Sequence, residues 1–269
     1  MRIAVIVTTY NRPDALAAVL AGYAAQADSE FELIVADDGS TAETRSLIDA
    51  FAKRAKIKVT HVWHDDQGFR AAAIRNRALA ATDADYIVFT DGDCIPPSDF
   101  VSRHRRLAEP DCFLSGNRIL LSEAFSRAVL ERKLTVHAWC GLRWAGVRLG
   151  GGINRLLPLL RLPDGAWRKR TPRRWEGVKT CNLSAWRTDL LRVNGLDESY
   201  TGWGLEDSDL VVRLIRAGVA HKSARFAAPV FHLWHRENPR GTLEQNRKRL
   251  EEVLHSGRIA ATLGVRQYL

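Results

Sequence analysis

The chain contains 269 residues, of which 46% are apolar and 26% are charged, and it carries a formal net charge of +9. A chain of this length and composition can bury the core of one large globular domain or of two small ones. The first apolar stretch, IAVIVTTY, follows Met1 and Arg2 directly and is far shorter than a membrane span, so the sequence predicts neither a signal peptide nor a membrane anchor. We therefore expect a cytoplasmic protein.

The positive charge is concentrated in one segment. Residues 143–179 contain ten Lys or Arg residues against Asp164 and Glu176, so this segment carries +8 of the net +9. A local basic segment indicates contact with an anionic surface at one place, whereas a protein that coats nucleic acid would be basic all round.

Strand and helix patterns alternate through the first half of the chain. Short apolar runs predict strands, and apolar residues three and four positions apart predict helices. The predicted elements are a strand at 3–10, a helix at 11–26, a strand at 31–36, a helix after 40, a strand at 58–64, a helix at 69–81, a strand at 86–91 and a helix at 97–109. Ser40 and Glu43 form the pattern of a capping box. Four successive strand–helix units predict an α/β fold with a mainly parallel twisted sheet flanked by helices.

The alternation loosens after Phe113. A basic segment rich in Gly and Pro comes first. It is followed by the segment KTCNLSAW, a short helix at 188–193, a helix that ends at Gly218, the segment PVFHLWH and a last amphipathic helix at 242–256. Thr242 and Gln245 predict the N-terminal cap of that last helix.

Three of the predicted strands end in acidic stretches, at 37–40, 64–68 and 91–93. Ligands of such a sheet bind beyond the carboxyl ends of the strands, so these carboxylates are expected to share one site. Because neighbouring carboxylates repel unless a cation lies among them, the Asp-x-Asp pair at 91–93 favours Mn²⁺ or Mg²⁺. The chain has neither GxGxxG nor GxxxxGK[ST], which disfavours a dinucleotide or P-loop site. The four cysteines are too widely spaced for a paired-cysteine zinc site, and we expect reduced, buried thiols.

Several of these segments resemble a known enzyme family. VIVTTYNRPDALAAVL and FELIVADDGS resemble the N-terminal signature of family 2 glycosyltransferases of the GT-A fold, and FTDGDCIPP resembles their Asp-x-Asp segment. KTCNLSAWRTDLLRVNGLDESYTGWGLEDSDLVVRLIRAG is similar to the acceptor-side motif of β-1,4-galactosyltransferases and bacterial chondroitin-polymerase-like enzymes, and GFRAAAIRNRALA matches the latter group. Together the matches cover most of residues 1–120 and 177–236.

The resemblance implies one GT-A catalytic domain over residues 1–241, with a Rossmann-like N-terminal half and a mixed acceptor-side half. Its parts would be a nucleotide-sugar half at 1–120, a basic insertion at 121–176 and an acceptor and metal half at 177–241, and a C-terminal helix at 242–269 would follow. The implied reaction moves a hexose or an N-acetylhexosamine from a UDP-sugar to a hydroxyl of a glycan acceptor, with inversion at the anomeric carbon and with Mn²⁺ or Mg²⁺ as cofactor.

The same resemblance assigns donor-binding residues. Thr8 and Tyr10 would pack near the base, Asp38 would hydrogen-bond the uracil edge, and Arg70 or Arg75 would face the diphosphate, whose growing charge a metal and an arginine neutralise without proton transfer. The full nucleotide-binding set is Thr8, Tyr10, Arg12, Asp38, Arg70, Arg75 and Asp91. The metal ligands implied are Asp93, Asp91, His232 and His235; the two histidines reach one site only if the strand has ended between them.

The motif GWGLEDSDL at 202–210 is expected to provide the base. By similarity to the galactosyltransferase motif, Asp207 takes the proton of the acceptor hydroxyl and Glu206 hydrogen-bonds the acceptor sugar, each carboxylate raising the other's affinity for protons. Trp203 would offer a flat face to a sugar ring, and Gly204 would let the backbone approach it closely. Asp209 is expected to face the helix dipole rather than the reaction.

The expected partners are a nucleotide-sugar donor, a glycan or lipid-linked glycan acceptor and an anionic membrane surface touched by residues 139–175, with no nucleic acid. Bacterial surface polysaccharide or lipopolysaccharide synthesis is the expected setting. Two alternatives stay open at this point. One is a nucleotidyltransferase acting on sugar phosphates, although TTYNRPD lacks its basic pyrophosphate loop; the other is a non-catalytic nucleic-acid-binding protein, although the basic segment contains no known module.

Overall fold

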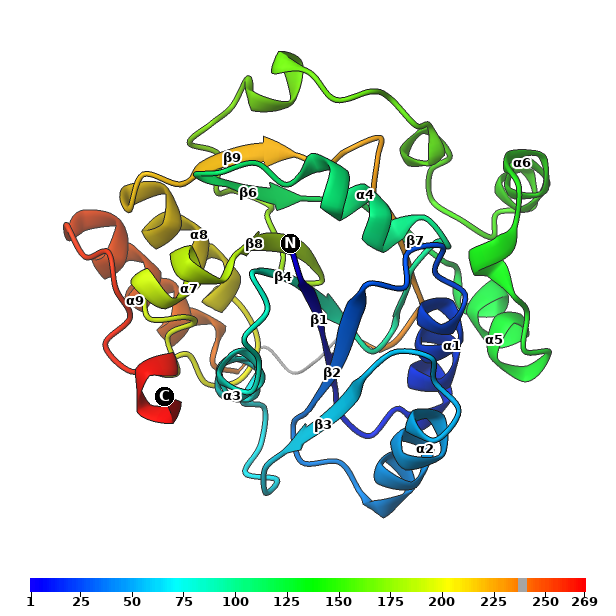
Figure 1. Cartoon of the computed structure of the whole chain (residues 1–269), viewed down its shortest axis with the longest axis horizontal. Coiled ribbons are helices and arrows are strands. Elements are labelled where there is room, and N and C mark those ends of the chain that lie inside the picture. The colour runs from blue at the N-terminus through cyan, green and yellow to red at the C-terminus, as the bar shows by residue number, and fades with distance from the viewer. Residues whose placement is uncertain (237–240) are drawn as a thin grey trace.

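The structure is a computed structural model and describes residues 1–236 and 241–269. In this part of the chain the strands form a seven-stranded sheet in the order β3-β2-β1-β4-β8-β6-β9 and a three-stranded sheet in the order β5-β10-β7 (Figure 1). The larger sheet comprises β1 (Ile3–Thr9), β2 (Phe31–Asp37), β3 (Val59–Trp63), β4 (Tyr86–Asp91), β6 (Cys112–Ser115), β8 (Asn182–Trp186) and β9 (Ala220–Ser223). Strands β3, β2, β1 and β4 are parallel, whereas β8 runs antiparallel to both β4 and β6. The predicted mainly parallel sheet with a mixed second half is confirmed.

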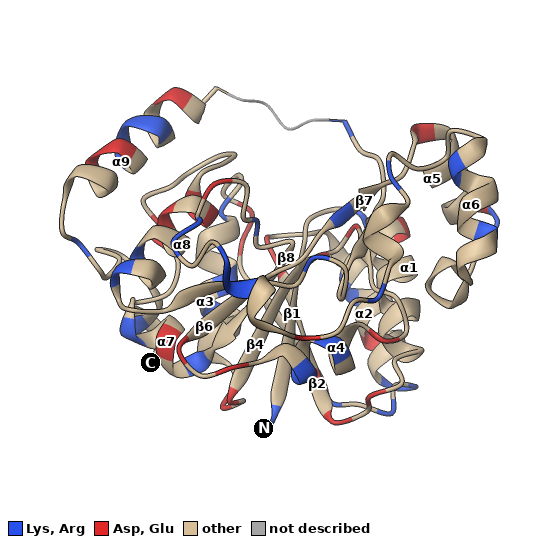
Figure 2. Ribbon diagram, turned by 90° about the horizontal axis from the view of Figure 1, so that it is seen from above, with Lys and Arg blue, Asp and Glu red and all other residues tan. Residues whose placement is uncertain are grey.

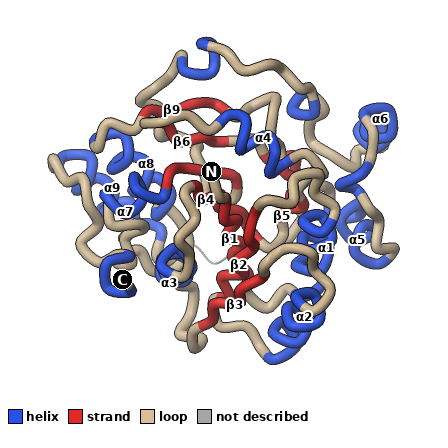
Figure 3. Tube along the Cα trace, in the orientation of Figure 1, coloured by secondary structure: helices blue, strands red, loops and turns tan. Residues whose placement is uncertain are grey.

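Helices cover both faces of the sheet, as Figure 3 also shows. Successive residues of β1 point to opposite faces: Val5 and Val7 belong to a core that includes Leu16 of α1, and Ile6 belongs to a second core that includes Ile74 of α3. Buried on both faces, β1 therefore reads as a continuous apolar run. Helices α1 (Pro13–Ala24), α2 (Ala42–Ala52) and α4 (Phe100–Leu107) contribute to the first core, and α3 (Ala71–Ala80), α7 (Arg187–Arg192) and α8 (Glu206–Arg216) contribute to the second.

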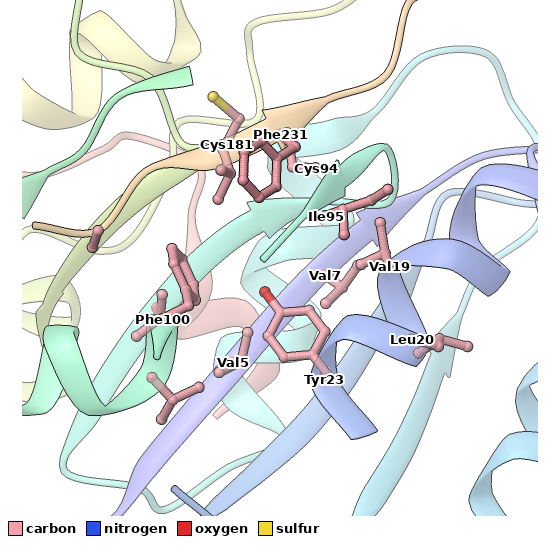
Figure 4. Close-up of a cluster of buried hydrophobic side chains, with 14 of the residues drawn as sticks. Val5, Val7, Val19, Leu20, Tyr23, Cys94, Ile95, Phe100, Cys181 and Phe231 are labelled. Carbon is pink, nitrogen blue, oxygen red and sulfur yellow. The ribbon is translucent and has the colours of Figure 1, made fainter. Parts of the chain in front are cut away.

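The small sheet lies next to the first core. It consists of β5 (Cys94–Ile95), β10 (Val230–His232) and β7 (Arg118–Leu120), with β10 in the middle. Ile95 and Phe231 pack in the same cluster as Val7, Val19 and Tyr23 (Figure 4). This packing fixes β5 and β10 beside the carboxyl ends of β1 and β4.

The basic insertion leaves the body of the molecule and returns to it. It contains α5 (Glu123–Glu131), α6 (Gly141–Leu149) and three 3₁₀ turns at Val136–Ala138, Leu157–Leu159 and Ala166–Lys169. Helices α5 and α6 lie at one margin of the molecule (Figure 2). Within residues 1–236 and 241–269, no helix combines the length and the apolar character that a bilayer crossing requires.

Part of the basic segment faces protein instead of an external surface. The Arg168 side chain is fully buried and donates to the backbone oxygens of Leu162, Ser223 and Arg225. The neighbouring Lys169 forms an ion pair with Glu109. Arg168 is therefore not available to an anionic surface, because buried backbone carbonyls accept its hydrogen bonds, whereas the membrane contact of residues 139–175 as a whole stays a prediction.

The C-terminal residues fold back on the second core. Helix α9 (Leu243–His255) packs against α8, and the final 3₁₀ turn (Val265–Tyr268) buries Val265 against α3. The hydroxyl of Tyr268 donates to Glu198 at 2.9 Å. The division into a domain at 1–241 and a separate C-terminal helix stays a prediction.

Both predicted side-chain caps are wrong. Helix α2 begins after Thr41, whose side chain makes no capping bond, and the Ser40 hydroxyl instead accepts the backbone N–H of Asn11 at 2.8 Å. Thr242 precedes α9 but its side chain makes no capping bond either. In the α2 case the polar group that the local pattern assigns to a cap has a tertiary partner instead.

The cysteine prediction holds for three of four residues. Cys94, Cys112 and Cys181 are free and buried, whereas Cys140 is free and exposed, because it precedes α6 in the protruding insertion.

Candidate active site

One pocket collects almost all of the predicted site residues. It has a volume of about 460 Å³ and lies where the carboxyl ends of β1 and β4 meet the first turn of α8. Of the predicted residues it is lined by Thr8, Tyr10, Arg12, Asp38, Arg75, Asp91, Asp93, Trp203, Gly204, Glu206, Asp207, His232 and His235. Arg70 is the exception. The rule that ligands bind at this edge of the sheet therefore located the pocket correctly.

Asp93 and the two histidines converge on one side of the pocket. The Nε2 atoms of His232 and His235 lie 3.7 and 3.4 Å from Oδ2 of Asp93. Strand β10 ends at His232, so the chain turns before His235 and brings both rings to the same carboxylate. Burial lowers the pKa of His232 and so favours the neutral imidazole that can bind a metal. One carboxylate and two imidazoles form a donor set that suits Mn²⁺, and these residues fit a divalent cation.

A buried arginine joins the two halves of the pocket. Arg75 of α3 donates to Thr8 Oγ1 and Asp91 Oδ1, both at 3.0 Å, and to Glu206 Oε1 at 3.4 Å. Burial raises the pKa of Asp91 to about 6, with Arg75 opposing the shift and Asp93 adding to it. The facing carboxylates raise the pKa of Arg75 despite its burial, so this arginine keeps its charge.

An unusual turn places the carboxylates of α8 in the pocket. Gly202, Gly204 and Leu205 all have positive φ values, of 67°, 100° and 77°. A Cβ atom on Gly202 would lie 2.2 Å from Thr242 Oγ1, so only glycine fits there without a shift. The side-chain amide of Asn246 on α9 donates to the Gly204 carbonyl at 3.0 Å and thereby braces the turn from outside.

The two adjacent carboxylates of α8 have different partners. Asp207 Oδ1 accepts the hydroxyl of Thr180 at 2.5 Å, and Lys179 Nζ lies 3.9 Å from Asp207 Oδ2. Oε2 of Glu206 is buried and, among the described residues, has no hydrogen-bond partner. Burial, with the neighbouring Asp207 charge adding to it, raises the pKa of Glu206 to about 7. Glu206 lines the pocket, so a hydroxyl group of a molecule bound there could donate a hydrogen bond to this unsatisfied oxygen.

Asp209 lies in the first turn of α8, where a carboxylate was expected to face the helix dipole. It is fully buried and forms an ion pair with Arg213, four residues later on α8. Asp209 is not among the residues that line the pocket, and its absence from the reaction stays a prediction.

The nucleotide end is lined by residues of β1 and by Asp38 after β2. The Tyr10 side chain is 46% exposed and its hydroxyl donates to Asp66 at 2.8 Å. The carboxylate of Asp38 is already engaged: Oδ1 lies 2.6 Å from His64 Nε2, and Oδ2 accepts the backbone N–H of Arg70 at 2.8 Å. The Arg70 guanidinium donates to the carbonyl of Asp65, outside the pocket. Of the two arginines considered for the diphosphate, only Arg75 lines the pocket.

Sequence reasoning missed several pocket residues. Arg118 of β7, Lys179, Thr180 and Phe69 all line the pocket. Burial lowers the pKa of Arg118, but the neighbouring thiols and the carboxylates of Asp91 and Asp207 outweigh burial and raise that pKa. Lys179 and Thr180 begin the segment KTCNLSAW, just before β8. Their position next to an apolar strand was the sequence signal that could have identified them as pocket residues.

Two family models match the chain. The model described as Glycosyl transferase family 2 matches residues 4–127, and the model described as N-terminal domain of galactosyltransferase matches residues 166–236. The second match contains the α8 turn and both histidines of the candidate metal site. Both matches favour glycosyl transfer over the nucleotidyltransferase and nucleic-acid-binding alternatives.

Curated relatives agree with these matches. The validoxylamine A glucosyltransferase of Streptomyces hygroscopicus subsp. limoneus is 27% identical over 226 residues, which is 81% of this chain and 48% of the relative. The chondroitin synthase of Escherichia coli is 25% identical over 248 residues, which is 88% of this chain and 35% of the relative. The chain thus spans about half the length of these relatives or less.

Solved structures share the fold at low sequence identity. TarS of S. aureus in complex with UDP superposes with a TM-score of 0.61 at 14% identity, over 100% of this chain and 68% of the other. The mannosyltransferase PcManGT of Pyrobaculum calidifontis, in complex with GDP-Man and Mn²⁺, gives 0.60 at 18% identity, over 94% and 61%. The family matches and this common fold lead to one conclusion: residues 4–127 match the family 2 glycosyltransferases, and the chain has the GT-A fold.

Proposed function

We propose that this chain transfers a sugar from a UDP-sugar to a hydroxyl of a glycan acceptor, with inversion and with dependence on a divalent metal. The observation that carries the proposal is the composition of the pocket. A cluster of Asp93, His232 and His235 and a separate carboxylate, Asp207, line the same 460 Å³ space. An inverting transfer needs these two functions, neutralisation of a leaving diphosphate and removal of a hydroxyl proton, on opposite sides of the transferred sugar.

The donor side is assigned to the strand ends. Asp93, His232 and His235, with Asp91 nearby, would hold Mn²⁺ or Mg²⁺, which supplies positive charge to the diphosphate when it is bound. Arg75 keeps its charge next to Asp91 and would bind the same diphosphate. The UDP complex of TarS and the Mn²⁺ complex of PcManGT support this assignment by analogy of fold.

Arg118 extends this positive surface. It lies on β7 beside the strand that carries His232, and it lines the pocket without an acidic partner among the described residues. A cation in that position would stabilise the charge that develops on the leaving diphosphate.

The acceptor side is assigned to α8. The Asp207 carboxylate would take the proton of the acceptor hydroxyl as that oxygen attacks the anomeric carbon from the face opposite the diphosphate. The Thr180 hydroxyl holds Asp207 Oδ1, which fixes the direction of Oδ2. Glu206 Oε2, buried without a partner in the described chain, would accept a hydrogen bond from another hydroxyl of the acceptor, and Trp203 would pack against its ring.

The setting is part of the proposal. Curated relatives include a chondroitin synthase, which supports a glycan acceptor in the synthesis of a bacterial surface polysaccharide or lipopolysaccharide by an enzyme on the cytoplasmic side of the membrane. The sugar transferred would be a hexose or an N-acetylhexosamine.

The proposal is tested with a panel of UDP-, GDP-, CMP- and dTDP-sugars in the presence of Mn²⁺. A ligand that binds the native state raises its thermal stability, so a UDP-sugar should raise the melting temperature more than the other sugars do. The same UDP-sugar should be hydrolysed slowly without an acceptor. A shift with CMP- or GDP-sugars alone would overturn the UDP assignment, and the absence of any shift or hydrolysis would overturn the function.

A further inference from the structure

Helix α6 displays leucines to solvent. Leu142 is 87% exposed and Leu149 is 90% exposed, the highest values among the large apolar side chains of the described residues. They are seven positions apart, which is two helical turns, so both side chains lie on the same face. A single exposed leucine needs no explanation, but two on one helical face form the apolar stripe of an amphipathic helix.

The opposite face of α6 is firmly attached to the body of the protein. Trp144 is buried and stacks on Phe231 with ring centroids 4.2 Å apart. Downstream, Ile153 pairs with Leu121 in a bridge, and the backbone N–H of Asn154 donates to the Leu120 carbonyl at 3.0 Å. The exposed leucines are therefore held in place by packing, and they do not belong to a frayed segment.

Positive charge flanks the apolar stripe. Residues 139–155 contain Arg143, Arg148 and Arg155 and no Asp or Glu. The guanidinium of Arg143 lies over the Trp139 ring at 3.6 Å, and no acidic side chain in the described part of the chain pairs with any of the three arginines. Leucines between unpaired arginines complement a surface that is apolar inside and anionic outside.

We propose that the exposed face of α6 docks on an anionic phospholipid bilayer. The helix has nine residues, which is too short to cross a membrane, so it would lie in the headgroup region with Leu142 and Leu149 inserted. Its stacking on Phe231 connects it to β10, the strand that carries His232 of the candidate metal site. A docked α6 would therefore hold the pocket close to the bilayer, where an acceptor with a lipid anchor resides. This last step rests on the proposed function, whereas docking itself does not.

Flotation of the protein with vesicles tests the proposal. Vesicles of phosphatidylcholine with phosphatidylglycerol are compared with vesicles of phosphatidylcholine alone. The wild type should float with the anionic vesicles and lose binding as salt is raised. The variant Leu142→Gln/Leu149→Gln should stay in the soluble fraction. Arg143→Ser/Arg148→Ser should lower the partition coefficient by roughly thirtyfold and flatten the salt dependence, since each arginine near an anionic leaflet contributes a binding free energy equivalent to a factor of about five.

A matched control replaces exposed leucines on the other side of the molecule. Leu263 and Leu269, at 47% and 66% exposure, lie near the C-terminus, opposite α6 in Figure 1. Leu263→Gln/Leu269→Gln should float like the wild type. All variants should bind UDP in the presence of Mn²⁺ as the wild type does, so a failure of docking is separate from a failure of the proposed function.

Two results would overturn the proposal. In the first, the wild type stays soluble with anionic vesicles, or the α6 leucine variant floats as well as the wild type does. In the second, sedimentation shows a wild-type dimer that the α6 leucine variant converts to a monomer, without vesicle binding by either. A second copy of the chain would then cover α6.

Discussion

Asp207 and Glu206 are neighbours in the sequence, but the surrounding residues give them different roles. Asp207 accepts a hydrogen bond from Thr180. Glu206 accepts one from Arg75 at Oε1, whereas its Oε2 has no partner in the described chain. A held carboxylate has the fixed orientation that a general base needs, and an unsatisfied one can accept a bond from substrate.

Replacement of Asp207 by Asn should lower the rate of transfer by about 10²- to 10⁴-fold, the usual cost of losing a general base. Binding of UDP with Mn²⁺ should not change, because Asp207 lies on the acceptor side. The measurement is steady-state transfer beside calorimetric UDP binding. Asp189→Asn is the matched control, since Asp189 of α7 is a buried carboxylate outside the pocket lining. Near-normal transfer by Asp207→Asn would show that another group is the base.

Glu206 should make stability depend on pH. The folded-state pKa of about 7 exceeds the usual value of 4.5, so the folded protein retains a proton that the unfolded chain releases. Wild-type stability therefore falls, relative to Glu206→Gln, as pH rises from 4.5 through 7. Between pH 5 and pH 8 the Gln variant should gain about 2.5 kcal/mol over the wild type in urea unfolding.

The control for this pH effect is Glu244→Gln on α9, where the side chain is 67% exposed and its ion pair contributes little. A stability difference between Glu206→Gln and the wild type that is the same at pH 5 and pH 8 would show that Glu206 titrates normally.

Sequence alone located these carboxylates but could not distinguish them. The resemblance placed Asp93 and Asp207 at the site because each lies in a short motif. Their partners are distant in the sequence, and no local pattern indicates the pairing: Thr180 lies 27 positions from Asp207, and Arg75 lies 131 positions from Glu206. Arg118 was missed for the same reason, because its place in the pocket depends on the pairing of β7 with the distant strand β10.

The turn before α8 shows what an element requires of its residues. Gly202→Ala should destabilise the protein by more than the roughly 1 kcal/mol of a left-handed alanine, because its Cβ would also meet Thr242 Oγ1. It should lower transfer as well, since Glu206 and Asp207 follow directly. The measurements are urea unfolding and steady-state transfer.

Gly218→Ala is the matched control. Its φ is 90° and a Cβ there would meet nothing within 4 Å, so it should cost only the backbone strain and leave transfer unchanged. Adding Thr242→Ala to Gly202→Ala should restore part of the lost stability. An equal loss in the two single glycine variants, with no rescue, would contradict the proposed clash.

Element prediction succeeded where local pattern and tertiary environment agree. Three of the four strand–helix units were found because β1, β2 and β4 are mostly buried and mostly apolar. The short strands β6, β7 and β9 were not identified as strands, because three or four residues carry too little periodicity. The caps failed because side-chain partners such as that of Ser40 come from distant segments.

The whole molecule combines a mainly parallel sheet with a basic insertion. Some arginines of this insertion bind other parts of the protein, and others remain available to a surface. Composition indicated +8 in residues 143–179, but it could not show that Arg168 is internal and that Arg161 pairs with Asp99, while Arg143 and Arg148 have no acidic partner in the described chain. Burial separates the structural arginines from the ones available to a surface, and burial depends on the fold.

A metal-dependent nucleotide-sugar site is tested most directly by a calorimetric titration of UDP into the wild-type protein, first with Mn²⁺ and then with excess EDTA. We expect clear binding with Mn²⁺ and a loss of more than about tenfold in affinity with EDTA, because the diphosphate would lose the positive charge of the metal ion that Asp93, His232 and His235 would bind. The variant His232→Ala/His235→Ala in Mn²⁺ should behave like the wild type in EDTA. Equal affinity for UDP under the two conditions would contradict a metal-dependent nucleotide-sugar site.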